Sequence, residues 1–231
     1  MSTTEVKVLG STGSPFVMRA VIALNIKSVD YELLEQNLVV KSELLLKSNP
    51  IYKKIPVLIH ADKPICESLV IVQYIDEVWT CGPSILPSDP YDRAIARFWA
   101  AYLDDKWFPS VRVIVLTAEG DEVKKETLQQ VATGLELLED AFPKCNKDGN
   151  FFGGERIGYL DIALGCFLPC LRVIEKVHNL KLLDEAKTPN LCKWAESFCS
   201  DAAVKDVIPE TDKLIEFAKV LIAKIKARPS N

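Results

Sequence analysis

A proline-rich segment at residues 79–90 separates two halves of the sequence that carry different hydrophobic patterns. It holds three prolines and one glycine, residues that interrupt helices and strands and are typical of linkers. Before this segment, short strand-like and helix-like runs alternate. After it, the apolar residues recur almost throughout with the period of a helix. The pattern predicts an α/β unit followed by an all-helical unit.

The first half predicts the order β-α-β-α-β-β-α. Its first helix begins at Ser14-Pro15, because serine is a favoured N-cap and proline is favoured at the first helical position. Its third helix begins at Ser68, and the apolar residues of one face are Val70, Ile71, Tyr74, Ile75 and Val78. The other expected elements are strands at 6–9, 31–35, 57–60 and 64–66 and a short helix at 42–47.

Three segments of the second half carry apolar residues at the spacing of an α-helix. One of these helices is opened by Pro189 and is marked by Leu191, Trp194 and Phe198. The other two are marked by Val131, Leu135, Leu138 and Phe142, and by Leu214, Phe217, Leu221 and Ile225.

Charge and apolar content narrow the class of partner. The net charge of -4, without blocks of basic residues, gives no electrostatic reason to expect nucleic acid. The N-terminus lacks the apolar stretch of a secretory signal, and no later run is long and apolar enough to span a bilayer. We therefore expect a cytoplasmic protein without a membrane or nucleic-acid partner.

The seven cysteines are scattered and odd in number, which favours free thiols in a reducing compartment over a disulfide framework. Cys166 and Cys170 are four residues apart, so we expect them on one face of one helix. With only His60 and His178 in the chain, a zinc site there is disfavoured, and buried apolar thiols are the expectation.

A set of short motifs follows in a fixed order along both halves. In the second half these are Arg97-Phe98-Trp99-Ala100 and Gly158 to Leu164. In the first half they are Ser14-Pro15-Phe16, Asn49-Pro50, Lys53 to Leu58, Cys66-Glu67-Ser68 and Gln73 to Glu77. Each motif is weak alone, but the ordered set covers nearly the whole chain and resembles the tau-class glutathione transferases of plants.

This resemblance implies a thioredoxin-like, glutathione-binding domain at residues 1–80, a linker at 81–90 and an all-helical domain at 91–231. It also implies a homodimer, glutathione as co-substrate and no metal. The implied activity is conjugation of the glutathione thiolate to hydrophobic electrophiles, with a possible side activity that reduces organic hydroperoxides.

The resemblance assigns Ser14 the catalytic role. A thiol with a pKa of about 8.5 is mostly protonated at neutral pH, and only the thiolate is a good nucleophile. Lowering that pKa by about two units requires roughly 2.7 kcal/mol of preference for the anion. A hydroxyl that donates to sulfur beside the positive end of a helix supplies much of this. Without the resemblance, Ser14 would be interpreted as a plain N-cap.

The resemblance assigns the other ends of glutathione to five further residues. Ile55 precedes Pro56 in what resembles a cis-proline turn, where its backbone would pair with the cysteinyl amide; a trans proline opening a strand is the alternative. Glu67 and Ser68 would hold the γ-glutamyl end at a helix N-terminus, or serve only as caps. Lys41 and Lys54 would meet the glycyl carboxylate, although exposed lysines are usually solvated surface.

The electrophile pocket is expected between the two halves. The loop before Ser14 departs from the family pattern, because Thr12 and Gly13 stand where an aromatic residue and a proline are common. Lys27-Ser28 likewise replaces a common glycine stop, and Asp161 is expected to cap a long helix locally. Pocket candidates by position are Thr12, Phe16, Phe108, Arg112, Val115, Cys170, Phe217 and Leu221, each of which could equally be helix core.

Three other functions compete with conjugation. The altered Thr12-Gly13 loop motivates a non-catalytic carrier of hydrophobic ligands. A thiol–disulfide oxidoreductase would need a low-pKa cysteine at the helix start, where Ser14 stands, and no C-x-x-C motif lies nearby. A Ser–His–Asp hydrolase is disfavoured because neither histidine has the context of a triad.

Overall fold

The computed structural model describes residues 6–37, 40–117, 122–123 and 125–226. Its first half has the predicted order of elements, with boundaries within one or two residues of those expected. These elements are β1 (Val6–Gly10), α1 (Pro15–Ile26), β2 (Glu32–Glu35), α2 (Glu43–Ser48), β3 (Val57–His60), β4 (Lys63–Cys66) and α3 (Ser68–Val78).

The four strands form one mixed sheet in the order β2-β1-β3-β4. β1 and β2 are parallel, with Gly10 beside Glu35. β3 is antiparallel to both β1 and β4, and Leu9 lies opposite Val57. The β3–β4 hairpin turns at Ala61 and Asp62, which both have positive φ, as a tight hairpin turn requires.

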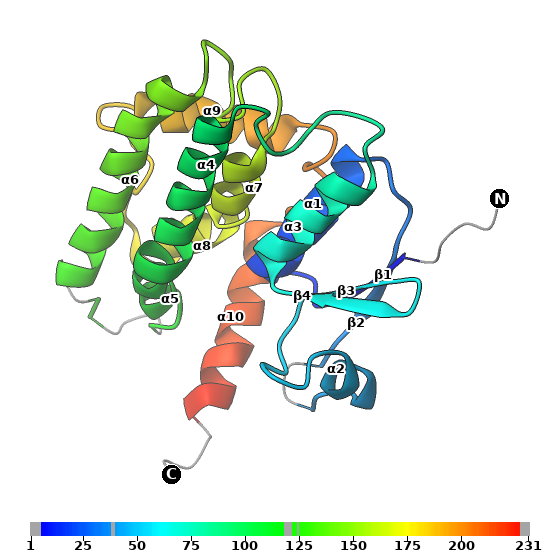
Figure 1. Ribbon diagram of the computed structural model, residues 1–231. Helices are drawn as coiled ribbons and strands as arrows, with labels where there is room; N and C mark the ends of the chain where they lie inside the picture. Colours follow the sequence, from blue (N-terminus) through cyan, green and yellow to red (C-terminus); the bar gives the residue numbers. More distant parts are fainter. Residues whose placement is uncertain (1–5, 38–39, 118–121, 124, 227–231) are drawn as a thin grey trace.

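Alternation along the strands divides the apolar side chains between the two faces of the sheet. Val6, Val8 and Leu58 join the main core with α1 and α3, whereas Leu9, Val57 and Leu45 of α2 form a small cluster of their own. In Figure 1, α1 and α3 accordingly lie on one side of the sheet and α2 on the other. This arrangement is the thioredoxin-like fold that the sequence predicts.

The second half is helical, as predicted, and its helices stand beside α1 and α3 (Figure 1). One buried cluster runs from α1 and α3 into these helices, so the two halves share a core. The helices are α4 (Pro90–Tyr102), η1 (Leu103–Trp107), α5 (Phe108–Val115), α6 (Lys125–Cys145), α7 (Tyr159–Gly165), α8 (Leu168–His178), α9 (Pro189–Ser200) and α10 (Thr211–Lys226).

One expectation about the helices is wrong. Cys166 and Cys170 do not share one helix, because the chain breaks at Phe167 and α7 is only seven residues long. The apolar face predicted for α3 is only partly covered: Ile71 and Ile75 are fully buried, but Val70 is 50% exposed and Val78 41%. The π-helical turn η1 between α4 and α5 was not anticipated either.

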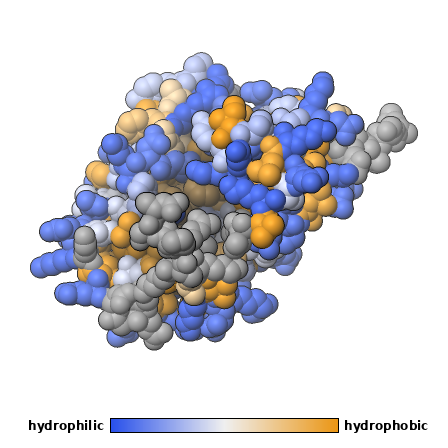
Figure 2. All heavy atoms as spheres, turned by 90° about the horizontal axis from the view of Figure 1, so that it is seen from below, coloured by the Kyte–Doolittle hydropathy of each residue, from blue (hydrophilic) through white to orange (hydrophobic). Residues whose placement is uncertain are grey.

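The surface seen in Figure 2 shows apolar side chains in separate patches among polar and charged ones. Across the described ranges, no helix combines the length and apolar character needed to cross a membrane.

Candidate active site

Sheet topology places Ser14, Ile55, Glu67 and Ser68 at one edge of the sheet. Since β4 is antiparallel to β3 and β3 to β1, strands β1, β2 and β4 all run in the same direction. Their carboxyl ends therefore meet at one edge of the sheet, where α1 begins after Ser14 and α3 begins at Ser68. Pro56 immediately precedes β3 and lies at the same edge. Such an edge is the usual place for a ligand in sheets of this kind.

Ser14 is the N-cap of α1 and the last residue of a tight turn. Its backbone N–H donates to the carbonyl of Ser11 at 3.0 Å, and Gly13, the third residue of the turn, has φ of +91°. A type II turn needs a positive φ at this position, which explains the glycine. The half-exposed hydroxyl of Ser14 makes no capping bond to the described helix, so it is available to a ligand.

Thr12, a pocket candidate, is held by Glu35 at the end of β2. The Thr12 N–H lies 3.1 Å from both carboxylate oxygens, and its hydroxyl donates to one of them at 3.2 Å. The Ser11 hydroxyl donates to the same carboxylate at 2.8 Å. Nothing in the sequence motifs pointed to Glu35, and only the parallel register of β1 and β2 reveals the contact.

The Ile55–Pro56 peptide bond is cis, as the resemblance predicted. Asn49 supports the loop that leads to it: this buried amide donates to the Lys54 carbonyl at 2.9 Å and accepts from the Tyr52 N–H at 3.1 Å. Asn49 follows α2, so the end of that helix positions the segment before the cis bond.

Glu67 and Ser68 lie where β4 passes into α3, as expected. Glu67 is exposed and has φ of +69°, a strained conformation that L-residues rarely adopt outside constrained sites. Ser68 is buried, and its hydroxyl accepts from Arg19 Nη1 at 3.2 Å. With its oxygen engaged in this way, the Ser68 hydroxyl keeps its proton for an acceptor in the site.

Sequence reasoning missed Arg19, a fully buried residue of α1. Its guanidinium binds Asp104 of η1 through two bonds of 2.7 and 2.8 Å, and it donates to the carbonyl of Ala163 at 2.8 Å. Arg19 therefore links Ser68 to η1 and to α7 of the second half. Its signal was present in the sequence, because a lone arginine inside the apolar run Phe16 to Leu24 must find a partner.

Lys41 and Lys54 are exposed, at the start and after the end of α2. Ser42, the N-cap of α2, is fixed beside Lys41: its hydroxyl donates to Gln36 Oε1 at 2.6 Å and accepts from the Leu45 N–H at 3.1 Å. The segment that carries Lys41 is thus tied to the end of β2.

Two of the predicted pocket residues contact each other across the two halves. The rings of Phe16 and Phe108 meet edge to face, 5.2 Å apart, and both contact Phe167. Phe108 and Phe167 stack at 4.4 Å. This aromatic cluster is apolar, and its member on α1, Phe16, follows Ser14 by two residues.

The remaining pocket candidates are dispersed. Arg112 is exposed on α5, and Phe217 is 36% exposed on α10. Val115 lines a small cavity of about 30 Å³ between α5, α8 and α10. Burial raises the pKa of the Cys170 thiol to about 12, which suits an inert apolar group. The side chain of Leu221 lies outside the part of the molecule that the structure describes.

Asp161 does more than cap α7 locally. This fully buried carboxylate accepts from the N–H groups of Phe152, Gly153 and Gly158, each at 2.8 Å, and from Trp194 Nε1 of α9 at 2.8 Å. It therefore joins the loop before α7 to a distant helix. The structural role expected from the sequence is correct, but the Asp161 carboxylate also bonds groups outside α7.

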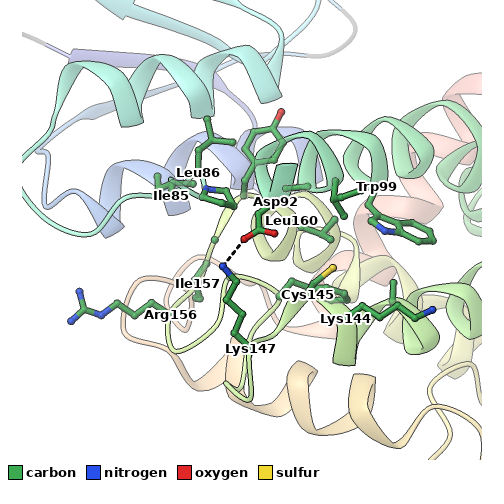
Figure 3. A pocket seen from close by; sticks show the side chains of 18 of the residues that line it. Ile85, Leu86, Asp92, Trp99, Lys144, Cys145, Lys147, Arg156, Ile157 and Leu160 are labelled. Carbon is green, nitrogen blue, oxygen red and sulfur yellow. Dashed lines mark hydrogen bonds and ion pairs between the residues drawn. The ribbon is translucent and has the colours of Figure 1, made fainter. Parts of the chain in front are cut away.

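A pocket of about 790 Å³ between the linker and the helices of the second half contains none of the predicted site residues. Figure 3 shows the apolar side chains that line this pocket between the linker, α4 and the end of α6, together with the Lys147–Asp92 ion pair. Its labelled apolar and thiol side chains are Ile85, Leu86, Trp99, Cys145, Ile157 and Leu160.

No group of three or more histidine, cysteine or carboxylate side chains, among residues with described positions, is arranged to hold a metal ion.

Comparison with known proteins gives consistent matches over both halves. Residues 4–77 match the family model "Glutathione S-transferase, N-terminal domain", and residues 95–202 match "Glutathione S-transferase, C-terminal domain". Glutathione S-transferase U17 of Arabidopsis thaliana is 60% identical over 98% of this chain and 100% of its own length. Glutathione S-transferase U18 of the same plant is 61% identical over the same shares.

Two solved structures resemble the whole chain. A tau-class glutathione S-transferase from mango (Mangifera indica) is 66% identical, with a TM-score of 0.89 over 95% of this chain and 100% of its own. A rice glutathione S-transferase, solved in complex with glutathione, is 34% identical, with a TM-score of 0.85 over 97% and 99% of the two chains.

Proposed function

The chain belongs to the tau class of the glutathione S-transferase family, and from that premise we propose that Ser14 activates glutathione for attack on an electrophile. The enzyme conjugates glutathione, its co-substrate, to a second substrate. The carrier hypothesis gains no support, because relatives that match over their whole length are named as transferases.

The observation that carries the role of Ser14 is its free hydroxyl at the N-terminus of α1. A thiolate placed there accepts the hydroxyl proton and faces the positive end of a twelve-residue helix. Both interactions favour the anion over the thiol and so lower the pKa of the bound sulfur. Ser14 is a donor in this scheme; it neither attacks the substrate nor removes a proton.

We propose that the rest of the sheet edge holds the other ends of the tripeptide. The backbone of Ile55, beside the cis bond, pairs with the cysteinyl amide. Ser68 donates to the γ-glutamyl carboxylate and Glu67 accepts from its ammonium. Lys41 and Lys54 bind the glycyl carboxylate at the exposed rim. The shared sheet edge and the engaged oxygen of Ser68 support this assignment.

For the electrophile we propose the apolar surface formed by Phe16 and Phe108, next to Ser14 along α1. Thr12, Arg112, Phe217 and Leu221 stay predictions of the same pocket. The hydroperoxide-reducing side activity also stays a prediction; it would use the same thiolate.

Ser14→Ala tests the proposal directly. We expect kcat with a generic aryl halide to fall about 100-fold, the usual cost of removing a donor from a developing or bound anion. We expect the pKa of bound glutathione, followed by the ultraviolet absorbance of the thiolate, to rise toward its value in solution. The exposed Ser200 provides the matched control, Ser200→Ala, with wild-type kinetics. Unchanged turnover in Ser14→Ala would remove this residue from the mechanism.

We further propose a homodimer in the cytoplasm. Val70 and Val78 of α3 and Tyr91 and Phe98 of α4 are exposed apolar residues on neighbouring helices. Arg97 joins these helices by donating to Gln73 Oε1 at 2.7 Å. A second copy of the chain is the occupant we propose for this surface. The seven free thiols support a reducing compartment. The domain division at residues 81–90 is likewise proposed.

A further inference from the structure

We propose that Glu35 is a positioning residue for Ser14: it holds the turn Ser11–Ser14 so that the hydroxyl faces the glutathione sulfur. This proposal rests on the proposed role of Ser14. It concerns a contact that lies outside the recognised motifs, in the segment where this chain departs from its family pattern.

The first argument is the number of bonds that converge on one carboxylate. Glu35 accepts from the Ser11 hydroxyl at 2.8 Å, from the Thr12 N–H at 3.1 Å and from the Thr12 hydroxyl at 3.2 Å. Hydrogen bonds to an ionised acceptor are stronger than neutral ones. They fix the first two residues of a four-residue turn whose last residue is Ser14.

The second argument is the position of Glu35 in the sheet. Gly10 and Glu35 are register partners at the ends of the parallel strands β1 and β2, and the Gln36 N–H donates to the Gly10 carbonyl at 2.7 Å. The carboxylate is therefore carried by a rigid strand end, beside the point where the turn leaves β1. A site residue supported by a strand is held more precisely than one supported by a loop.

The third argument is the opposite side of the same turn. A Cβ added to Gly13 would lie 3.1 Å from Leu214 Cδ2 of α10, so that helix packs directly on the turn. No large side chain of the turn itself is available to hold it, because the residues are serine, threonine and glycine. The polar clamp from Glu35 and the cover from Leu214 together fix the turn.

The two roles that Glu35 could have, holding the turn or acting only through its negative charge, predict opposite changes in the thiol pKa when the carboxylate is removed. A carboxylate acting only through its charge near the sulfur would raise the thiol pKa, so its removal would lower that pKa. A clamp lowers the thiol pKa by orienting Ser14, so its removal raises that pKa. The direction of the change therefore separates the two roles.

The experiment compares Glu35→Ala, Glu35→Gln and Glu32→Ala, with the pKa of bound glutathione and the pH profile of kcat as readouts. For Glu35→Ala we expect a rise of about one unit in the thiol pKa, which lowers kcat about threefold at about pH 7 and about tenfold at about pH 5.5, where little of the sulfur is ionised in either protein. The KM for glutathione should stay within about twofold. Activity should recover at high pH, where the sulfur is ionised without help; a merely unfolded protein would lose activity at every pH.

Glu35→Gln keeps one acceptor oxygen and should retain most of the activity. Glu32→Ala removes a charge from the other end of the same strand and should match the wild type. A thiol pKa that is unchanged or lowered in Glu35→Ala would overturn the positioning role. If Ser14→Ala also left the pH profile unchanged, the proposed role of Ser14 would fail, so the two failures are distinguishable.

Discussion

The guanidinium of Arg19 lies fully buried between the two halves of the molecule, where an unpaired charge would be very costly. Asp104 neutralises this charge through two hydrogen bonds. Arg19 Cζ also lies 5.2 Å from the ring centroid of Phe16 and 5.0 Å from that of Phe167. The same group engages Ser68. A single side chain therefore couples the α1–α3 pair to η1 and α7.

Replacing Arg19 should destabilise the protein strongly. Arg19→Ala leaves the Asp104 carboxylate without its partner in a partly buried place, and breaking a buried pair costs about 3–5 kcal/mol. The free energy of unfolding in urea measures this loss. Arg112→Ala, an exposed arginine on α5, should change that free energy by less than about 0.5 kcal/mol. Equal effects of the two substitutions would contradict the argument.

At the scale of elements, the end of α1 fixes the linker between the halves. Lys27 replaces a common glycine stop, and Ser28 takes the positive φ of 53° in its place. Lys27 is buried, and its Nζ lies 2.7 Å from Oδ1 of Asp76 in α3. The same ammonium donates to the Pro83 carbonyl at 2.8 Å. Asp76 also accepts from the N–H groups of Ile85 and Leu86, each at 2.9 Å.

This ion pair gives a stability contribution with a defined pH dependence. Burial acts to raise the pKa of Asp76, but the Lys27 ammonium and the two linker N–H groups hold it below its ordinary value of 3.8. A carboxyl with a depressed folded pKa stabilises the folded state above its unfolded pKa. That stabilisation is lost as pH falls through the folded pKa.

Asp76→Asn should therefore lower the free energy of unfolding by about 3 kcal/mol near neutral pH, because Lys27 stays buried without an anion. The difference from wild type should hold down to about pH 4 and shrink below it. Urea titrations of both proteins between about pH 7 and 3 measure this difference. A gap that widened on acidification would have the wrong sign for this pair.

At the scale of the whole molecule, the sequence predicts the α/β pattern of the first half and the helical pattern of the second. It does not predict the contacts between distant residues that hold these elements together. Helical periods and the Ser14-Pro15 cap signal are local, so the elements and the position of Ser14 at the start of α1 could be derived from the sequence. Glu35 and Arg19 act through partners set by strand register and by helix packing across the halves. Such contacts join residues 23 to 147 positions apart, which no local pattern encodes.

The α3 face shows the same limit. Its period correctly indicates an amphipathic helix, yet Val70 and Val78 are exposed within one chain, as are Phe98 and Tyr91 of α4. Exposed apolar side chains gathered on adjacent elements, with polar groups such as the Arg97–Gln73 pair among them, are typical of protein interfaces. The incomplete burial is thus explained if another copy of the chain covers this surface.

Phe98→Glu should break the proposed dimer. Phe98 is 60% exposed, so a charge there is harmless to the isolated fold but costly when a second chain desolvates it. Light scattering coupled to size-exclusion chromatography should give the mass of two chains for the wild type and of one for the variant. Val113→Glu, which charges a residue 54% exposed on α5, should leave the mass of two chains unchanged. A wild-type protein that elutes as a single chain of 25.8 kDa at micromolar concentration would show that the exposed α3–α4 surface has another occupant, or none.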